Sequence, residues 1–80
     1  MTDTEKTFRK LSPEAVRKKT GLSRSEMASL LGMSTSGYDS WEDGLRKPGG
    51  AAYRLLYLLE IDPNGVIEKL NAQAGPTTID

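Results

Sequence analysis

One repeated spacing marks four helix starts in this 80-residue chain, and it limits the possible folds more than any other feature. In each case an apolar residue precedes Ser or Asp, and a second apolar residue lies five positions after the first. Such a Ser or Asp caps free backbone N–H groups, and the two apolar side chains close over the cap. The four sets are Leu11-Ser12 with Val16, Leu22-Ser23 with Met27, Met33-Ser34 with Tyr38, and Ile61-Asp62 with Val66.

Glycines and apolar spacing predict the helix ends and one further helix. Gly21, Gly32 and Gly44 each follow a helical stretch, where a left-handed residue ends a helix. A helix is expected from about Gly50 to about Glu60, because apolar residues recur there at helical spacing. No segment alternates as a strand would. The chain is thus predicted to be all-α with five helices: residues 1–11 an N-terminal arm, 12–70 the domain, and 71–80 a flexible C-terminal tail.

The composition argues against catalysis and membrane insertion. The chain has no His and no Cys, so the commonest general base and the commonest metal ligands are missing. We therefore expect no enzyme, no cofactor and no metal. No apolar run approaches the roughly 20 residues of a membrane span. Since Met1–Lys10 is charged and has no apolar signal segment, we expect a cytoplasmic protein.

The charges are unevenly distributed although the net charge is zero. Residues 6–54 contain ten basic and five acidic residues, whereas residues 55–80 contain one basic and four acidic residues. This segregation fits a domain with one side facing DNA. A solvated surface of mixed charge is the alternative, and charge alone leaves it open.

Two of the expected helices, Arg24–Leu31 and Thr35–Asp43, are joined by a turn of three residues. The small Ala28 allows the second helix to cross closely, Gly32 turns the chain, and Met33 and Tyr38 fill the angle. These features are typical of a helix-turn-helix. The alternative is an ordinary helical hairpin.

At this spacing the stretch from residue 16 to residue 59 resembles the Cro-like phage repressor family, of the XRE type. The matching residues are Leu22-Ser23, Met27-Ala28, Leu31-Gly32-Met33-Ser34, Tyr38 and Trp41-Glu42-Asp43-Gly44. A softer resemblance, to the antitoxin branch of that family, is carried by Arg46-Lys47-Pro48, Gly50, Ala52 and Leu55-Leu56. The resemblance implies a five-helix lambda-repressor-like DNA-binding domain whose second and third helices form the helix-turn-helix.

The resemblance also implies which residues read DNA bases, because in this family the helix after the turn enters the major groove. The expected base-contacting residues are Thr35, Ser36, Gly37, Asp39 and Ser40. Short hydroxyl side chains make single, tolerant hydrogen bonds, so we expect DNA shape to supply part of the specificity. Phosphates repel Asp39, for which we favour a solvated role, or a role in rejecting other sequences, over acceptance from a cytosine amino group. A plain polar helix surface is the alternative for this face.

Phosphate contacts are expected at helix N-termini and in the basic loop. The candidates are Arg24, Ser34, Arg46, Lys47 and Gly50; Arg9, Lys10, Lys18 and Lys19 add positive charge, and residues 6–10 are a candidate arm. A merely flexible basic loop is the alternative for residues 46–50. The resemblance further implies a structural ion pair between Arg17 and Glu42.

The C-terminal third carries more apolar surface than a small core readily covers, which favours a homodimer on a palindromic operator. The candidate interface residues are Tyr53, Tyr57, Leu58, Val66, Ile67 and Leu70. The alternative is that they complete the monomer core.

The predicted function is sequence-specific binding of double-stranded DNA by a transcriptional repressor of phage, prophage or toxin-antitoxin type. The alternative is a protein-binding helical module, an antitoxin-like partner of a toxin or another regulator. Such a module would use Tyr53, Tyr57 and the acidic last helix.

Overall fold

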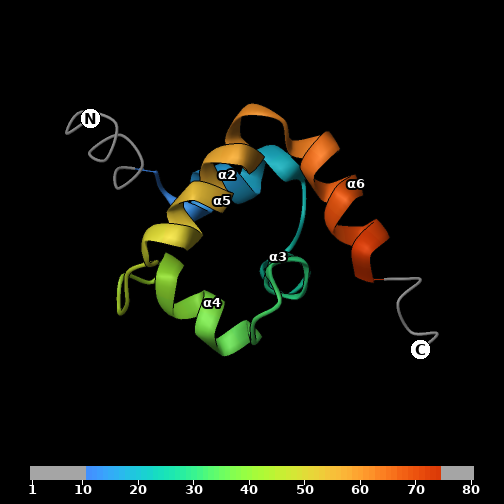
Figure 1. Ribbon diagram of the computed structural model, residues 1–80. Coiled ribbons are helices and arrows are strands. Elements are labelled where there is room, and N and C mark those ends of the chain that lie inside the picture. The colour runs from blue at the N-terminus through green and yellow to red at the C-terminus, as the bar shows by residue number, and fades with distance from the viewer. Residues whose placement is uncertain (1–10, 75–80) are drawn as a thin grey trace.

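The computed structural model describes residues 11–74, and over this range the chain is helical, with five helices and no strand. The helices are α2 (Pro13–Thr20), α3 (Arg24–Leu31), α4 (Thr35–Glu42), α5 (Gly50–Ile61) and α6 (Pro63–Ala74) (Figure 1). The predicted all-α class is therefore confirmed.

The four predicted caps are present, since each capping side chain accepts a hydrogen bond from the backbone three residues later. The bonds are Ala15 N to Ser12 Oγ (3.2 Å), Glu26 N to Ser23 Oγ (3.1 Å), Gly37 N to Ser34 Oγ (3.0 Å) and Gly65 N to Asp62 Oδ1 (3.2 Å). Glu26 also accepts from the Ser23 N–H at 2.9 Å, which completes the reciprocal cap of α3. Gly32 ends α3 with φ of +75°, a value that favours glycine.

Two predicted boundaries need correction. Helix α6 continues to Ala74, so residues 71–74 are helical and do not belong to a flexible tail. The physical reason is that residues 66–74, which precede Gly75-Pro76, contain neither glycine nor proline. At the other end Leu11, assigned to the arm, packs against the core. The rest of the predicted arm and tail, residues 1–10 and 75–80, lies outside the described residues.

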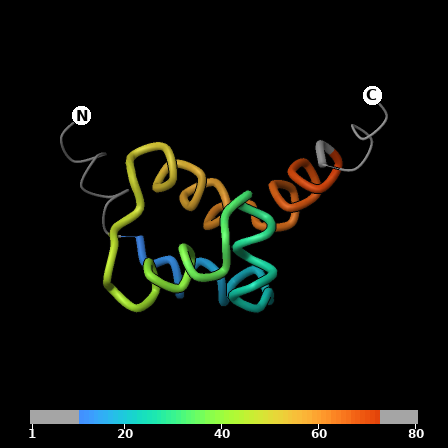
Figure 2. Tube along the Cα trace, turned by 90° about the horizontal axis from the view of Figure 1, so that it is seen from below, coloured from blue at the N-terminus to red at the C-terminus, as the bar shows by residue number. Residues whose placement is uncertain are grey.

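The core is formed by six buried residues from four helices. They are Val16 of α2, Met27 and Ala28 of α3, Tyr38 of α4, and Leu56 and Leu59 of α5. Helix α2 packs against α5, and α3 packs against α4. In the turned view of Figure 2, α5 and α6 follow one another along one side, while α2, α3 and α4 occupy most of the other side. Helix α4 is thus held mainly by α3 and α2.

Candidate functional site

One side of α4 is anchored in the protein and the other is exposed. On the anchored side, Tyr38 is fully buried and its ring lies at 58° to the ring of Trp41, with centroids 5.8 Å apart. On the other side Thr35 and Ser36 are exposed, and the side chain of Asp39 is 37% exposed. Two of the five predicted base-contacting residues are therefore exposed, and a third, Asp39, is partly exposed one helical turn later.

The other two predicted base-contacting residues, Gly37 and Ser40, are half-buried. The Ser40 hydroxyl donates to the Gly37 carbonyl oxygen at 2.6 Å, so its hydrogen is already used inside the helix. A Cβ at Gly37 would lie 3.1 Å from Ser34 Oγ, tighter than an ordinary contact. The absence of a side chain at position 37 thus leaves room for the Ser34 cap, which explains the glycine by packing within α4.

The predicted ion pair between Arg17 and Glu42 is present. Arg17 Nε donates to Glu42 Oε2 at 2.6 Å, and Arg17 Nη2 donates to Glu42 Oε1 at 3.2 Å. The Tyr38 hydroxyl donates to Glu42 Oε2 at 2.5 Å, and the Glu42 side chain has no exposed surface. Burial opposes ionisation of Glu42, but the hydrogen bonds from Arg17 and Tyr38 outweigh burial and lower the pKa of Glu42. Glu42 is therefore a charged anchor that ties α4 to α2.

Arg24, for which a phosphate contact is predicted, has all three guanidinium nitrogens bound by carboxylates of α4 and its C-cap. Nε donates to Glu42 Oε1 (3.0 Å), Nη1 to Asp39 Oδ1 (3.2 Å) and Nη2 to Asp43 Oδ1 (3.2 Å). Partial burial opposes its charge, but the hydrogen bonds with Asp39 and Asp43 outweigh burial and raise the pKa of Arg24. Sequence reasoning missed this network. Its signal was the carboxylate spacing 39, 42 and 43, which brings three acidic groups within about one helical turn, where a single guanidinium can reach them.

The other predicted phosphate-contacting residues are exposed. Arg46 and Lys47 form no ion pair with any residue between 11 and 74, and Ser34 and Gly50 are also exposed. A Cβ on Gly50 would meet no atom within 4 Å, so internal packing does not require a glycine there.

Two of the additional basic residues form ion pairs with acidic residues of the protein. Lys18 pairs with Glu14 at 3.3 Å, and Lys19 pairs with Glu60 at 2.7 Å. Lys6, Arg9 and Lys10 lie outside the described residues.

The predicted dimer residues divide into two groups. Tyr53, Val66 and Ile67 are half-buried and pack against the core, as the monomer alternative expected. Tyr57 and Leu70 are half-buried as well, whereas Leu58 is 46% exposed and lies three residues before Ile61, which is 58% exposed. Leu58 is thus the most accessible of the six.

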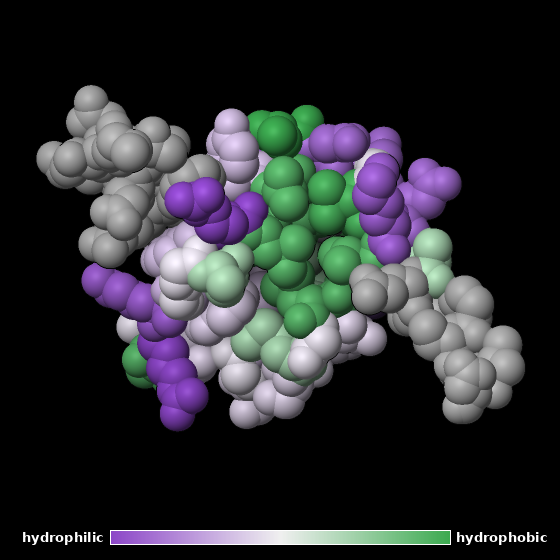
Figure 3. All heavy atoms as spheres, viewed as in Figure 1, coloured by the Kyte–Doolittle hydropathy of each residue, from purple (hydrophilic) through white to green (hydrophobic). Residues whose placement is uncertain are grey.

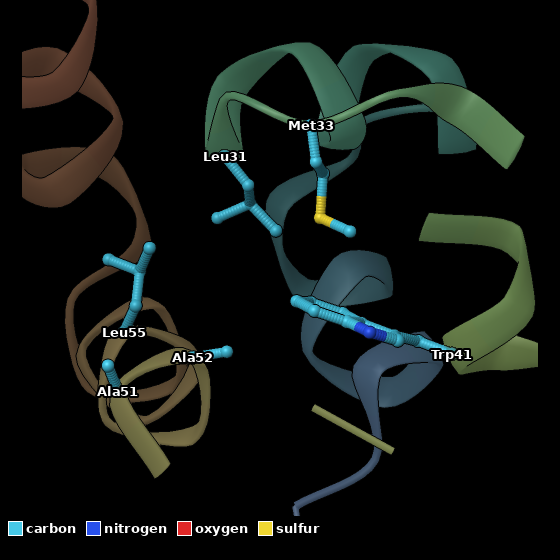
Figure 4. A pocket seen from close by; sticks show the side chains of 6 residues that line it. All are labelled: Leu31, Met33, Trp41, Ala51, Ala52 and Leu55. Carbon is cyan, nitrogen blue, oxygen red and sulfur yellow. The ribbon is translucent and has the colours of Figure 1, made fainter. Parts of the chain in front are cut away.

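An apolar pocket of about 210 Å³ lies where α5 faces the α3–α4 turn and Trp41. Figure 4 shows Met33 and Trp41 facing Ala52 across it, and Figure 3 shows apolar side chains gathered at the centre of one face of the molecule. The lining residues are Leu31, Met33, Trp41, Ala51, Ala52 and Leu55. The pocket arises because α5 packs chiefly on α2 and α6. It was not predicted from the sequence.

Comparisons with protein families, curated proteins and solved structures found no match to this chain. Among residues 11–74, no three Asp or Glu side chains are grouped so as to hold a metal ion. None of the helices in that range combines the length and apolar character needed to cross a membrane.

Proposed function

We propose that this protein binds double-stranded DNA sequence-specifically and regulates transcription, as a repressor of phage, prophage or toxin-antitoxin type. In this proposal α3 and α4 act as a helix-turn-helix within a lambda-repressor-like domain. The observation that carries the proposal is the two-sided character of α4. Its inner side is held by Tyr38 and Glu42, while its outer side leaves Thr35 and Ser36 free to meet base edges.

The charges near α4 are compatible with a nucleic-acid partner. Arg24 offsets part of the negative charge of Asp39 and Asp43. Exposed Arg46 and Lys47 lie in the loop between α4 and α5 and supply positive charge for phosphates. The nearby N-terminus of α5 begins with glycines, which leaves its backbone N–H groups accessible.

A salt titration tests the proposal. Affinity for duplex DNA from the region upstream of its own gene is expected to fall steeply as salt rises, because phosphate contacts release counterions. Lys47→Ala should weaken binding to all duplexes alike and reduce the slope of log affinity against log salt by about one. Lys18→Ala is the matched control, since Lys18 is also exposed but pairs with Glu14 on α2. If the chain binds no duplex at low salt, DNA binding is ruled out.

A protein-binding helical module is the second candidate, and the apolar pocket favours it. A pocket lined by Trp41, Met33 and Leu55 suits an apolar side chain of a partner protein. Co-purification of a partner whose binding survives Lys47→Ala but is lost with Ala52→Asp would favour this function over DNA binding. Ala52 lines the pocket, whereas Lys47 does not.

A further inference from the structure

Asp39 lies in the middle of the exposed side of α4, and Arg24 holds its carboxylate. Arg24 Nη1 donates to Asp39 Oδ1, while the other two guanidinium nitrogens are bound to Glu42 and Asp43. Because Glu42 is itself buried and held by Arg17, the guanidinium is fixed from the protein side. The Asp39 side chain is therefore oriented before any ligand arrives.

Asp39 retains one carboxylate oxygen for an external donor. Within residues 11–74, no hydrogen bond reaches Asp39 Oδ2, and the side chain is 37% exposed. Thr35 and Ser36 precede it by four and three positions, so the three side chains share one side of the helix. A carboxylate only accepts hydrogen bonds, and its external partner must therefore be a donor.

In the major groove the donors on base edges are the amino groups of cytosine and adenine. The adenine amino group is flanked by the acceptors N7 of adenine and O4 of thymine, which repel a carboxylate. The cytosine amino group has such an acceptor on one side only, O6 of guanine. We infer that Asp39 reads cytosine through Oδ2, and that Arg24 is the positioning residue that orients this carboxylate and offsets its charge near phosphates. This inference rests on the proposed DNA-binding function and assigns a C·G base pair to one position of the site.

Selection of bound duplexes from a random pool, followed by competition measurements, tests the assignment. The wild-type chain should select cytosine at one position, and replacing that C·G pair should weaken binding about tenfold. With Asp39→Asn the preference at the same position should move to adenine, because a carboxamide both accepts from N6 and donates to N7.

Asp43→Asn is the matched control. It removes the same charge and the same kind of contact with Arg24 at 3.2 Å, but at the end of α4. It should raise affinity for all duplexes alike and leave the selected sequence unchanged. Arg24→Lys keeps the positive charge but loses the planar set of donors. It should retain overall affinity within a few-fold while weakening the cytosine preference at that one position.

The outcomes separate the two proposals. If Asp39→Asn and the wild type select the same bases at every position, the assignment of Asp39 is overturned and DNA binding stands. The assignment is also overturned if Asp43→Asn changes the preference as much as Asp39→Asn does, since charge alone would then explain the effect. Failure of the wild-type chain to bind any duplex overturns both.

Discussion

Glu42 connects α4 to both α2 and α3 through its buried carboxylate. Its carboxylate has no exposed surface and accepts hydrogen bonds from Arg17, Arg24 and Tyr38. A buried charge with this many donors is held in one geometry, and its loss leaves a positive charge without its partner. Single substitutions here test how α4 is held.

Glu42→Gln is expected to lower the free energy of unfolding by about 3 kcal/mol, because Arg17 would lose its charged partner while remaining mostly buried. Chemical denaturation followed by circular dichroism measures this loss. Glu14→Gln, which removes an exposed partner of Lys18, is the control and should change stability by less than about 0.5 kcal/mol. Equal effects of the two variants would contradict the anchoring role of Glu42.

The lowered pKa of Glu42 also predicts how stability depends on pH. The pKa lies below its unfolded value of 4.5, so the unfolded state binds a proton before the folded state does as the solution is acidified. The contribution of Glu42 is therefore complete above about pH 4.5 and is lost as pH falls through the folded pKa. Denaturation midpoints of the wild type should decline in this acid range, and those of Glu42→Gln should decline less. Parallel declines would show that other carboxyl groups cause the effect.

At the scale of the elements, four of the five helix starts between residues 11 and 74 have a side-chain cap, and the cap of α6 is closely packed. The Asp62 carboxylate folds over Gly65 so closely that a Cβ at position 65 would overlap it. At the start of α5, by contrast, Gly49 supplies no side-chain cap and a Cβ at Gly50 meets nothing. Local packing therefore favours a glycine at position 65 but not at position 50.

Replacing Gly50 and Gly65 with Ala, one at a time, tests this difference. Gly50→Ala should stabilise the protein by roughly 0.5 to 1 kcal/mol through helix propensity alone. Gly65→Ala should gain the same propensity but lose the Asp62 cap, which is worth about 1 kcal/mol, so its net effect should be near zero. Thermal unfolding of the two variants measures the difference. In an Asp62→Ala background Gly65→Ala should become stabilising, and the idea fails if it does not.

At the scale of the whole molecule, the fold leaves apolar surface at two places on α5. One is the pocket edge at Ala51, and the other is the exposed pair Leu58 and Ile61 near its C-terminal end. A dimer on a palindromic operator needs its two recognition helices about 34 Å apart, so the location of the dimer surface decides the spacing of half-sites.

We expect self-association through the Leu58 surface. Leu58→Asp should shift sedimentation equilibrium toward the monomer and weaken binding to a palindromic duplex, because it places a charge in an apolar interface. Ala51→Asp is the control on the same helix and should leave the mass unchanged. If Ala51→Asp dissociates the dimer and Leu58→Asp does not, the dimer forms across the pocket instead.

The parts of the fold that the sequence predicted depend on interactions between residues close together in the chain. The caps at Ser12, Ser23, Ser34 and Asp62 each depend on residues within five positions, so their spacing was sufficient to place the helix starts. The pairing of Arg17 with Glu42, 25 positions apart, came instead from the resemblance to a known family. Gly32 predicted the end of α3 because its φ of +75° suits glycine.

The tertiary structure alone decided what Arg24 does and where the pocket lies. Arg24 is 15 to 19 positions from the carboxylates it binds, and only the crossing of α3 and α4 brings them together. The pocket exists because α5 packs mainly on α2 and α6. The apolar residues of α5 have the same helical spacing whichever helix they face, so this spacing does not select the partner helix. Local rules specify helices because caps and turns act over a few residues. The partner of each helix face depends on how all the faces fit together, and no short stretch of sequence contains that information.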